Sequence, residues 1–423
     1  MTAIPWFHPF SFLVHLPFRV ADVENEGDEK FAILHENVHY LQSVASYSGI
    51  FRFSQFWVLY TKVARLRQNT SDDDFNEAER SQIRIDYQEA QEQLLALEPA
   101  DGIRYGIVDI DDVIANDVRQ VLLPSDEKAY AFLRQIDGNV HANFFDILAL
   151  QESMAFAYEV WLGRDVSAFY DQMVSSTSPD FFQYAMGIEA VKTVTNWESR
   201  EQVAGLTVIL CDFALNHPSP ASAFFFALQI VHAEWSEEPE ELPVDEIIER
   251  LETYLIIPEV LEEIARQNGF IHMLAERAKA SDDQFDRATG SILEVMLLAI
   301  KLRLENPSYF AKSLLYDFGN EEFLGNFHMP AYISGKEFVD TGISPNRHEF
   351  ILYIHAMHHR LSNIAAEDTD PQCPYIDSTC CGFEKNQYCQ TEPWNRRFEH
   401  QLSDDIQQVC LYRFVEHSFQ NPS

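Results

Sequence analysis

The sequence predicts a mainly α protein of the α+β class, with a small sheet or hairpin near the N-terminus and a large helical C-terminal region. Three observations predict it. Apolar residues recur with helical spacing over most of residues 144–365. Residues 10–20 (FSFLVHLPFRV) form a short apolar run that suits an extended segment. Residues 129–144 contain two apolar runs separated by Asp137-Gly138, a turn typical of hairpins.

Length and composition indicate a folded, cytoplasmic protein. A chain of 423 residues suffices for two or three domains, or for one catalytic unit with large additions. The hydrophobic content of 46%, with 32 Phe, supports a large packed core and excludes a disordered chain. Six Cys are too few for a disulfide scaffold, and no stretch reaches about 18 uninterrupted apolar residues. The first residues lack the basic region of a secretory signal, so we expect a cytoplasmic location and reduced thiols.

The charge is strongly acidic and restricts the partners. The chain has 30 Lys and Arg against 67 Asp and Glu, a formal net charge of −37. Phosphate backbones and anionic lipids repel such a surface, and no run of basic residues offsets it, so direct nucleic-acid binding and membrane binding are excluded. A basic protein partner or substrate is compatible with the charge, although most of the acidic side chains are expected simply to form a solvated surface.

The N-terminal region is expected to contain a strand followed by a helix. Residues 10–20 are the strand, and Pro17 within it favours an edge or a bulge over a central strand. A helix is expected over about 31–47, because acidic residues directly before it lie where a first helical turn favours negative charge. Gly49 is the expected end of this helix.

The rest of the chain is expected to be helical around a few strands. Helices are expected over 51–67 and 76–98, short strands within 101–125, the hairpin over 129–144, and a strong helix from 144 to about 163. The segment 366–395, rich in Cys, Pro, Asp and Asn, is expected to be irregular. Further helices are expected over 198–216, 221–235, 243–255, 258–279, 283–304 and 345–363.

Residues 31–42 read FAILHENVHYLQ and carry the chemistry of a zinc site. On a helix, His35 and His39 lie four positions apart and project from one face, so both imidazoles can bind one Zn²⁺ at about 2.0–2.1 Å. Glu36, one position further round the helix, can reach a water on the metal and take its proton. A catalytic zinc also needs a third protein ligand and an open position, and the motif is short enough to arise by chance.

A second segment, ALQESMAFAYE over 149–159, adds a carboxylate in an apolar helix. The neighbours of Glu152 are unusually apolar for a solvated charge, and buried carboxylates are normally paired or bound to metal. The two segments resemble the gluzincin metallopeptidases, whose third ligand is a glutamate in a Glu-x-x-Ala setting on a downstream helix. The resemblance implies a zincin-like core of two helices, with Zn²⁺ on His35, His39 and Glu152 and with Glu36 as the general base. Ala155 would let the two helices approach closely.

The resemblance covers only these two segments and departs from the clan's pattern in three respects. Glu152 follows the second histidine by 113 positions, which is long for the clan, so residues 50–140 would form a helical insertion. Phe156 stands where some relatives keep a carboxylate that orients a histidine, and Glu159 or Gln151 could replace it. Only one strand is expected before the metal helix, and the Gly-Ala-Met-Glu-Asn signature of aminopeptidases is missing.

Two parts of a peptidase site stay less defined. The oxyanion of a tetrahedral intermediate needs a hydrogen-bond donor, and the sequence does not choose among the candidates. An extended substrate is expected to pair with the strand over 10–20, as is the habit of the clan. The candidate donors are His141, Tyr158, His232 and His328.

A di-iron carboxylate bundle is a weaker interpretation of the same helix. Glu36-x-x-His39 is the half-motif of such a site, but the bundle needs the motif on two helices. No other histidine in the chain has a glutamate three positions before it.

Cysteines and histidines also cluster near the C-terminus. Cys373, Cys380, Cys381 and Cys389 lie within 17 residues but lack a Cys-x-x-Cys pair. A structural metal site, reduced or partly buried thiols, and a disulfide or redox switch therefore all stay open, whereas Cys211 and Cys410 are expected in helix cores. His355 and His359 repeat the spacing of the metal helix without its glutamate. We expect them on a helix at an interface or behind the metal ligands, rather than at a second catalytic site.

The sequence therefore predicts a zinc-dependent peptidase, an intracellular endopeptidase of narrow specificity whose substrate is a protein or peptide. Two alternatives stay open: a catalytically silent acidic helical protein that binds a basic partner, and a zinc hydrolase that acts on a substrate other than a peptide. The expected organisation is a catalytic core over 1–165, a helical region over 166–365 that completes the cleft, and a Cys-rich irregular segment with a tail over 366–423. The oligomeric state is not predicted.

Overall fold

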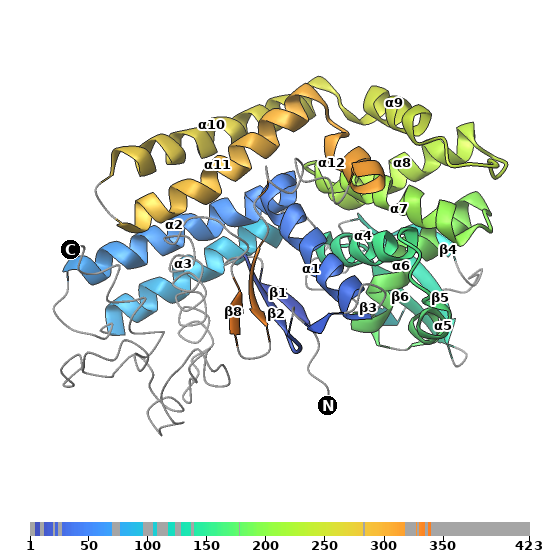
Figure 1. Ribbon diagram of the computed structural model, residues 1–423, viewed down its shortest axis with the longest axis horizontal. Coiled ribbons are helices and arrows are strands. Elements are labelled where there is room, and N and C mark those ends of the chain that lie inside the picture. Colours follow the sequence, from blue (N-terminus) through green and yellow to red (C-terminus); the bar gives the residue numbers. More distant parts are fainter. Residues whose placement is uncertain are drawn as a thin grey trace.

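The computed structural model is mostly helical, with two small sheets (Figure 1). None of its helices is long and apolar enough to cross a membrane, as far as the described residues extend. These residues are 5–8, 12–19, 22–23, 28–69, 77–95, 105–107, 117–122, 128–136, 139–176, 178–281, 284–317, 327, 330–334 and 337–339.

Helix α4 (Ile147–Trp161) lies at the centre of the fold. It packs against α1 (Asp28–Ala45), α6 (Pro179–Thr195) and α7 (Arg200–Leu215), so nearly all of its side chains are buried. The side chain of Asp146 caps its first turn by accepting a hydrogen bond from the Ala149 N–H at 2.6 Å. Because α4 has neighbours on most of its faces, even its polar residues are enclosed.

The remaining helices form an outer layer (Figure 1). The long helices α10 and α11 pack against each other along the top of the view, and α2 packs against α3 below them. These helices are α2 (Tyr47–Asn69), α3 (Glu77–Leu95), α5 (Ser167–Ser175), α8 (Pro220–Glu234), α9 (Val244–Leu255), α10 (Pro258–Ala280), α11 (Gln284–Glu305), α12 (Tyr309–Lys312) and the π-helical turn η2 (Ser313–Asp317).

The first sheet joins the two ends of the described chain. Its strand order is β1-β2-β7-β8, with β1 (Trp6–His8), β2 (Leu13–Leu16), β7 (Ala331–Ser334) and β8 (Glu337–Val339). Strand β2 is antiparallel to β1 and parallel to β7. The expectation of a single edge strand over 10–20 was therefore wrong: two strands precede α1, and β2 is a central strand that ends just before Pro17.

The second sheet contains the predicted hairpin. Its order is β3-β6-β5-β4, and every pair is antiparallel, with β3 (Tyr105–Ile107), β4 (Asp117–Leu122), β5 (Lys128–Ile136) and β6 (Asn139–Phe144). Ile136 pairs with Asn139, which leaves the two residues of the Asp-Gly turn between the strands. Among the described residues of the segment 50–140, the first half is helical, whereas the second half contains β3, β4 and β5 instead of the expected helical insertion.

Gly49 does not end the first helix, as the sequence suggested. Helix α1 ends at Ala45, α2 begins at Tyr47, and Gly49 lies in the first turn of α2. A Cβ atom at Gly49 would lie 2.3 Å from the carbonyl oxygen of Gln42. The glycine therefore permits the sharp turn between the two helices rather than stopping one of them.

Several other expectations can be compared with the described residues. The helices predicted near 198–216, 221–235, 243–255, 258–279 and 283–304 are confirmed as α7 to α11. Helices α5 and α6 and strands β7 and β8 were not predicted. The helix expected over 345–363 and the irregular segment over 366–395 lie outside the described residues.

A buried arginine holds the C-terminal end of α1. Arg303 of α11 donates from Nε to the Ala45 carbonyl oxygen at 2.5 Å and from Nη2 to Asp212 of α7 at 2.7 Å. Arg303 and Asp212 are 7% and 3% exposed. A positive group at a helix C-terminus also interacts favourably with the helix dipole. The contact fixes α1 relative to α7 and α11.

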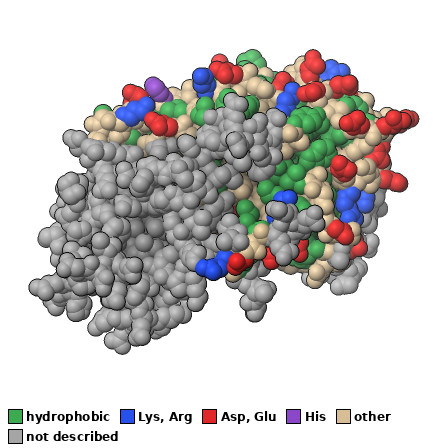
Figure 2. Space-filling view, in the orientation of Figure 1, with side chains coloured by type: hydrophobic (Ala, Val, Ile, Leu, Met, Phe, Trp, Pro, Cys, Tyr) green, Lys and Arg blue, Asp and Glu red, His purple; other side chains and the backbone are tan. Residues whose placement is uncertain are grey.

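Part of the acidic excess is visible on the surface around α9 and the loop before it (Figure 2). Glu237, Glu240 and Glu241 of this loop are exposed. The Glu238 carboxylate accepts hydrogen bonds from the backbone N–H groups of Glu198 and Ser199, at 2.9 and 2.7 Å. These charges are solvated or used in capping the start of α7, as expected for a structural surface.

We expect Gly187→Ala to lower the free energy of unfolding by about 1–3 kcal/mol, because an added methyl group overpacks the contact between α6 and α4. A Cβ atom at Gly187 would lie 2.7 Å from the Ser153 Cβ atom. Gly269→Ala in α10 is the control, since a Cβ atom there meets nothing within 4 Å. It should raise stability by about 0.5–1 kcal/mol through helix propensity. Denaturant unfolding measures both variants, and equal effects would contradict the close α4–α6 packing.

Candidate metal centre

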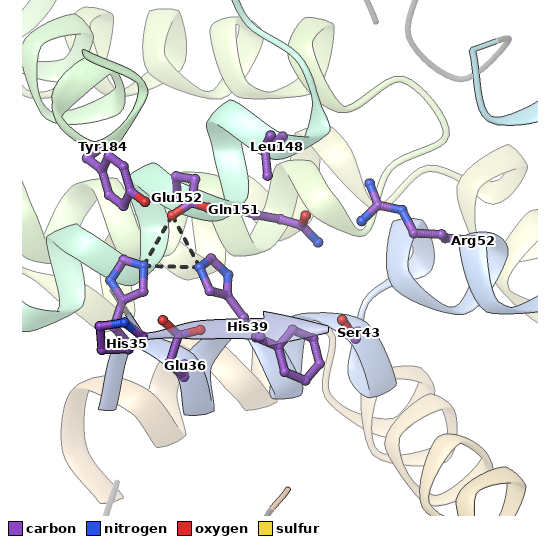
Figure 3. A pocket seen from close by; sticks show the side chains of 11 residues that line it. His35, Glu36, His39, Ser43, Arg52, Leu148, Gln151, Glu152 and Tyr184 are labelled. Carbon is purple, nitrogen blue, oxygen red and sulfur yellow. Dashed lines mark hydrogen bonds and ion pairs between the residues drawn. The ribbon is translucent and has the colours of Figure 1, made fainter. Parts of the chain in front are cut away.

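Three potential ligand atoms converge between α1 and α4 (Figure 3). The His35 Nε2 and His39 Nε2 atoms lie 3.1 Å apart, and Glu152 Oε2 lies 3.1 Å from the first and 3.2 Å from the second. A tetrahedral ion with bonds of about 2.0–2.1 Å separates its ligand atoms by about 3.3 Å. The nearly equilateral triangle therefore has the dimensions of three ligands on one such ion.

The orientation of His35 is fixed by Glu159. His35 Nδ1 lies 2.6 Å from Glu159 Oε1, so Nδ1 donates to the carboxylate and Nε2 carries its lone pair towards the triangle. Glu159 also accepts a hydrogen bond from Arg164, whose Nη2 lies 3.2 Å from Asp28 Oδ1. Of the two residues suggested by the sequence, Glu159 is the one that contacts a histidine, two helical turns beyond Glu152.

The orientation of His39 is fixed by Gln42. The Gln42 side chain donates from Nε2 to the Gln151 carbonyl oxygen at 3.0 Å, which turns its Oε1 towards His39. His39 Nδ1 donates to this oxygen at 2.8 Å, so its Nε2 atom also faces the triangle with a lone pair. Gln151 thus helps to orient His39 indirectly, because its backbone carbonyl holds the Gln42 side chain. The sequence analysis missed Gln42, although its position three residues after His39 places it on the same helix face.

The donor set fits a metal cation. With both Nδ1 atoms donating elsewhere, two imidazole lone pairs and a carboxylate oxygen face one another at about hydrogen-bond distance. Three acceptors in this arrangement repel unless a proton or a cation lies between them. Two imidazole nitrogens and one carboxylate oxygen are a common protein ligand set for catalytic zinc.

Glu36 lies beside the triangle with one oxygen unpaired. The residue is 5% exposed, and its Oε2 atom has no hydrogen-bond partner among the described residues. It lines the same cleft as His35, His39 and Glu152 (Figure 3). A buried carboxylate oxygen without a partner is costly, so a group absent from the protein chain itself would satisfy it.

Protonation equilibria show how strongly the site attracts positive charge. Burial lowers the pKa of His35, but hydrogen bonds and charge attraction from Glu152 and Glu159 outweigh it and raise this pKa well above 6.5. The pKa of His39 is also raised, because the attraction of Glu152 outweighs burial. Burial raises the pKa of the Glu152 carboxyl, yet the two imidazoles hold it well below its usual range. Burial raises the pKa of Glu36, against a lowering by the two histidines.

Two cavities meet at this cluster, towards opposite ends of α1. A narrow cleft of about 140 Å³ extends past His39 to Arg52 of α2. A wider cavity of about 500 Å³ lies on the side of His35 and Glu159. Both are lined by Pro5, His35, Glu36 and Tyr184.

Tyr184 of α6 was missed by the sequence analysis, because α6 itself was not predicted. Its ring lies 5.7 Å from the His35 ring, and its hydroxyl lies on the side of Glu152 in Figure 3. Three of the four donors suggested from the sequence are among the described residues, and none of these three lines either cavity. Tyr158 is buried elsewhere on α4, His141 lies in β6 and His232 is exposed on α8. His328 lies outside the described residues.

The C-terminal cysteines and histidines cannot be placed relative to this centre. Cys373, Cys380, Cys381 and Cys389 lie outside the described residues, as do His355, His359 and Cys410. Cys211 is buried in α7, as predicted for a core residue, and burial raises the pKa of its thiol well above its ordinary value.

Comparisons with protein-family models, with curated proteins and with solved structures give no match to this chain. The likeness to gluzincins therefore stays a resemblance of two segments, and the zincin-like core stays a prediction. What can be argued about function depends on the geometry of the site itself.

We expect Glu159→Gln to weaken zinc binding about 10- to 100-fold, because His35 loses the carboxylate that orients it. Glu263→Gln is the matched control, since Glu263 is a partly buried carboxylate of α10 that also accepts hydrogen bonds, from Tyr47 and Arg266. Competition with a zinc-binding dye measures the affinities. An unchanged affinity in Glu159→Gln would contradict the role assigned to this contact.

Proposed function

We propose that this protein is a zinc-dependent peptidase that uses Glu36 as its general base. The observation that carries the proposal is the triangle of His35, His39 and Glu152 beside the unpaired oxygen of Glu36. Three protein ligands leave one position open on a tetrahedral ion, which is typical of catalytic rather than structural zinc sites. The Glu36 carboxylate lies beside the triangle without being part of it, as expected of a general base that takes a proton from water at the open position.

The chain's own residues have separate tasks in this proposal. A Zn²⁺ ion held by His35, His39 and Glu152 would lower the pKa of a water at its open position towards about 7 and would polarise the substrate carbonyl. Glu36 accepts the proton of the attacking water and later delivers it to the leaving amine, a task for which the raised pKa of this carboxyl is suited. Glu159 and Gln42 keep the two imidazoles oriented. The Tyr184 hydroxyl donates a hydrogen bond to the developing oxyanion.

Strand β1 is where we propose that an extended substrate pairs. The expected strand, β2, is hydrogen-bonded to β1 on one side and to β7 on the other, so it has no free edge for a substrate. Strand β1 ends the sheet, and no described strand pairs with its outer edge. The ring of Phe7 in β1 stacks on His39 at 6.5 Å, so this edge passes beside the metal ligands.

Space on both sides of the metal centre supports an endopeptidase. The narrow cleft continues towards Arg52 and the wider cavity towards α5, so a chain could extend in both directions from Glu36. A narrow specificity agrees with the restricted cleft. The alternatives are a silent protein that binds a basic partner and a hydrolase of another substrate class, and the experiments below separate them.

Protein purified without added metal should contain about one zinc per chain, and His39→Ala should lose it, because two ligands rarely retain a catalytic ion. Elemental analysis by mass spectrometry measures zinc, iron and manganese together. His232→Ala, an exposed histidine on α8, is the control and should keep the metal. Folded protein that neither contains nor takes up zinc would contradict the proposal. A second zinc that survives His39→Ala would belong to the segment 373–389.

Glu36→Gln should retain zinc but lower peptide hydrolysis by about 10²–10⁴-fold, since it removes the general base. Glu29→Gln, an exposed glutamate in the first turn of the same helix, should leave the rate unchanged. A mixture of unstructured peptides analysed by mass spectrometry detects the cleavage. Zinc-loaded wild type that cleaves no peptide, or a Glu36→Gln variant of full activity, would refute the peptidase assignment.

A further inference from the structure

The wider cavity beside the metal centre is built from apolar side chains of four helices. Phe156 of α4 and Met173 of α5 form its floor and are each 1% exposed. Phe169 of α5 and Phe181 of α6 form its rim, with their rings edge to face at 5.2 Å. Ala32 of α1 contributes a small side chain, which leaves the space open. With about 500 Å³, the cavity lies within the range of about 300–1,000 Å³ typical of ligand sites.

Apart from Glu36, which the proposed function assigns to the attacking water, the charged groups of this cavity are already paired. Glu159 accepts hydrogen bonds from His35 and Arg164. Arg164 also pairs with Asp28 at 3.2 Å. A cationic side chain would have to displace Arg164 from Glu159, and an anionic one would have to displace Glu159 or Asp28 from Arg164. Neither exchange gains an interaction, so apolar surface decides what the cavity holds.

The exposed aromatic rim gives a second reason for an apolar occupant. Phe169 is 40% exposed at the mouth of the cavity. An apolar ligand that covers this ring and the cavity floor removes their apolar surface from water, which lowers the free energy. A small side chain would leave this surface hydrated.

We infer that this cavity selects peptides with a large apolar side chain, such as Phe or Leu, next to the bond that is cut. The inference rests on the proposed peptidase function. It follows from position as well as from chemistry, because Glu36, His35 and Tyr184 line both the cavity and the narrow cleft. A main chain that passes Glu36 in the cleft places one adjacent side chain in the wider space.

Binding of uncleaved peptides tests the inference without depending on turnover. The probes are acetylated, amidated hexapeptides of one sequence with Phe, Leu, Ala, Lys or Glu at a single position, which is moved along the peptide. Zinc-loaded Glu36→Gln protein is titrated with them by calorimetry. At one position, Phe and Leu should bind at least about tenfold more tightly than Ala, Lys and Glu. Wild type should cut next to that position, as mass spectrometry of the products shows.

Two further substitutions assign the preference to the cavity. Phe169→Ala removes part of the rim and should reduce the advantage of Phe over Ala by about fivefold or more. Ala32→Leu fills the space and should abolish the advantage, with the zinc content as the check that the metal helix is intact. Phe226→Ala is the control, because Phe226 is an exposed phenylalanine on α8 (48%) that does not line the cavity.

The outcomes separate this inference from the function on which it rests. Equal binding of all peptides, or a preference that survives both Phe169→Ala and Ala32→Leu, would overturn the inference even if wild type cleaves peptides. A Phe preference that both substitutions reduce, in a protein that cleaves nothing, would support the cavity as an apolar binding site and refute the peptidase function.

Discussion

The charged side chains buried between α1 and α4 must be neutralised, and the arrangement of the surrounding structure depends on how this is done. Glu36, Glu152 and Glu159 are enclosed there together with His35 and His39. Charges buried in an interior are very costly unless they are paired. Arg164 and His35 compensate Glu159, but neither Glu152 nor Glu36 forms an ion pair with an arginine or lysine of the described residues. A cation in the triangle would balance the charge of the cluster, which supports the proposed metal site.

Rigid helices keep the ligands within reach of that cation. Most of α4 is apolar and is enclosed by α6 and α7, so Glu152 and Glu159 project from a helix whose position is fixed by packing. The end of α1 is held by Arg303. Sites built on packed helices keep their geometry better than sites on loops. The cluster is therefore preorganised by interactions that involve none of the ligands directly.

The surroundings of the centre form a polar and an apolar compartment, to which the proposed function assigns different tasks. The narrow cleft contains the polar groups of α1 and α4, Phe7 of β1, and Arg52 at its far end. The wider cavity presents aromatic and aliphatic surface, and the charges of Glu159 and Arg164 in its wall are paired with each other. In the proposed peptidase, the reaction takes place in the first compartment, and side chains are discriminated in the second. Glu36 and Tyr184 lie where the two meet.

The sequence by itself determined the features that depend on short-range spacing. The pair His35 and His39, Glu36 beside them and the helices around them follow from the helical period, and Asp-Gly marks the hairpin between β5 and β6. The apolar context and the resemblance pointed to Glu152. Tertiary structure alone decided that Glu159 rather than Gln151 orients His35, that Tyr184 of an unpredicted helix faces the centre, and that β7 converts β2 into a central strand. These features join segments far apart in the chain, and such contacts leave no periodic pattern along either segment.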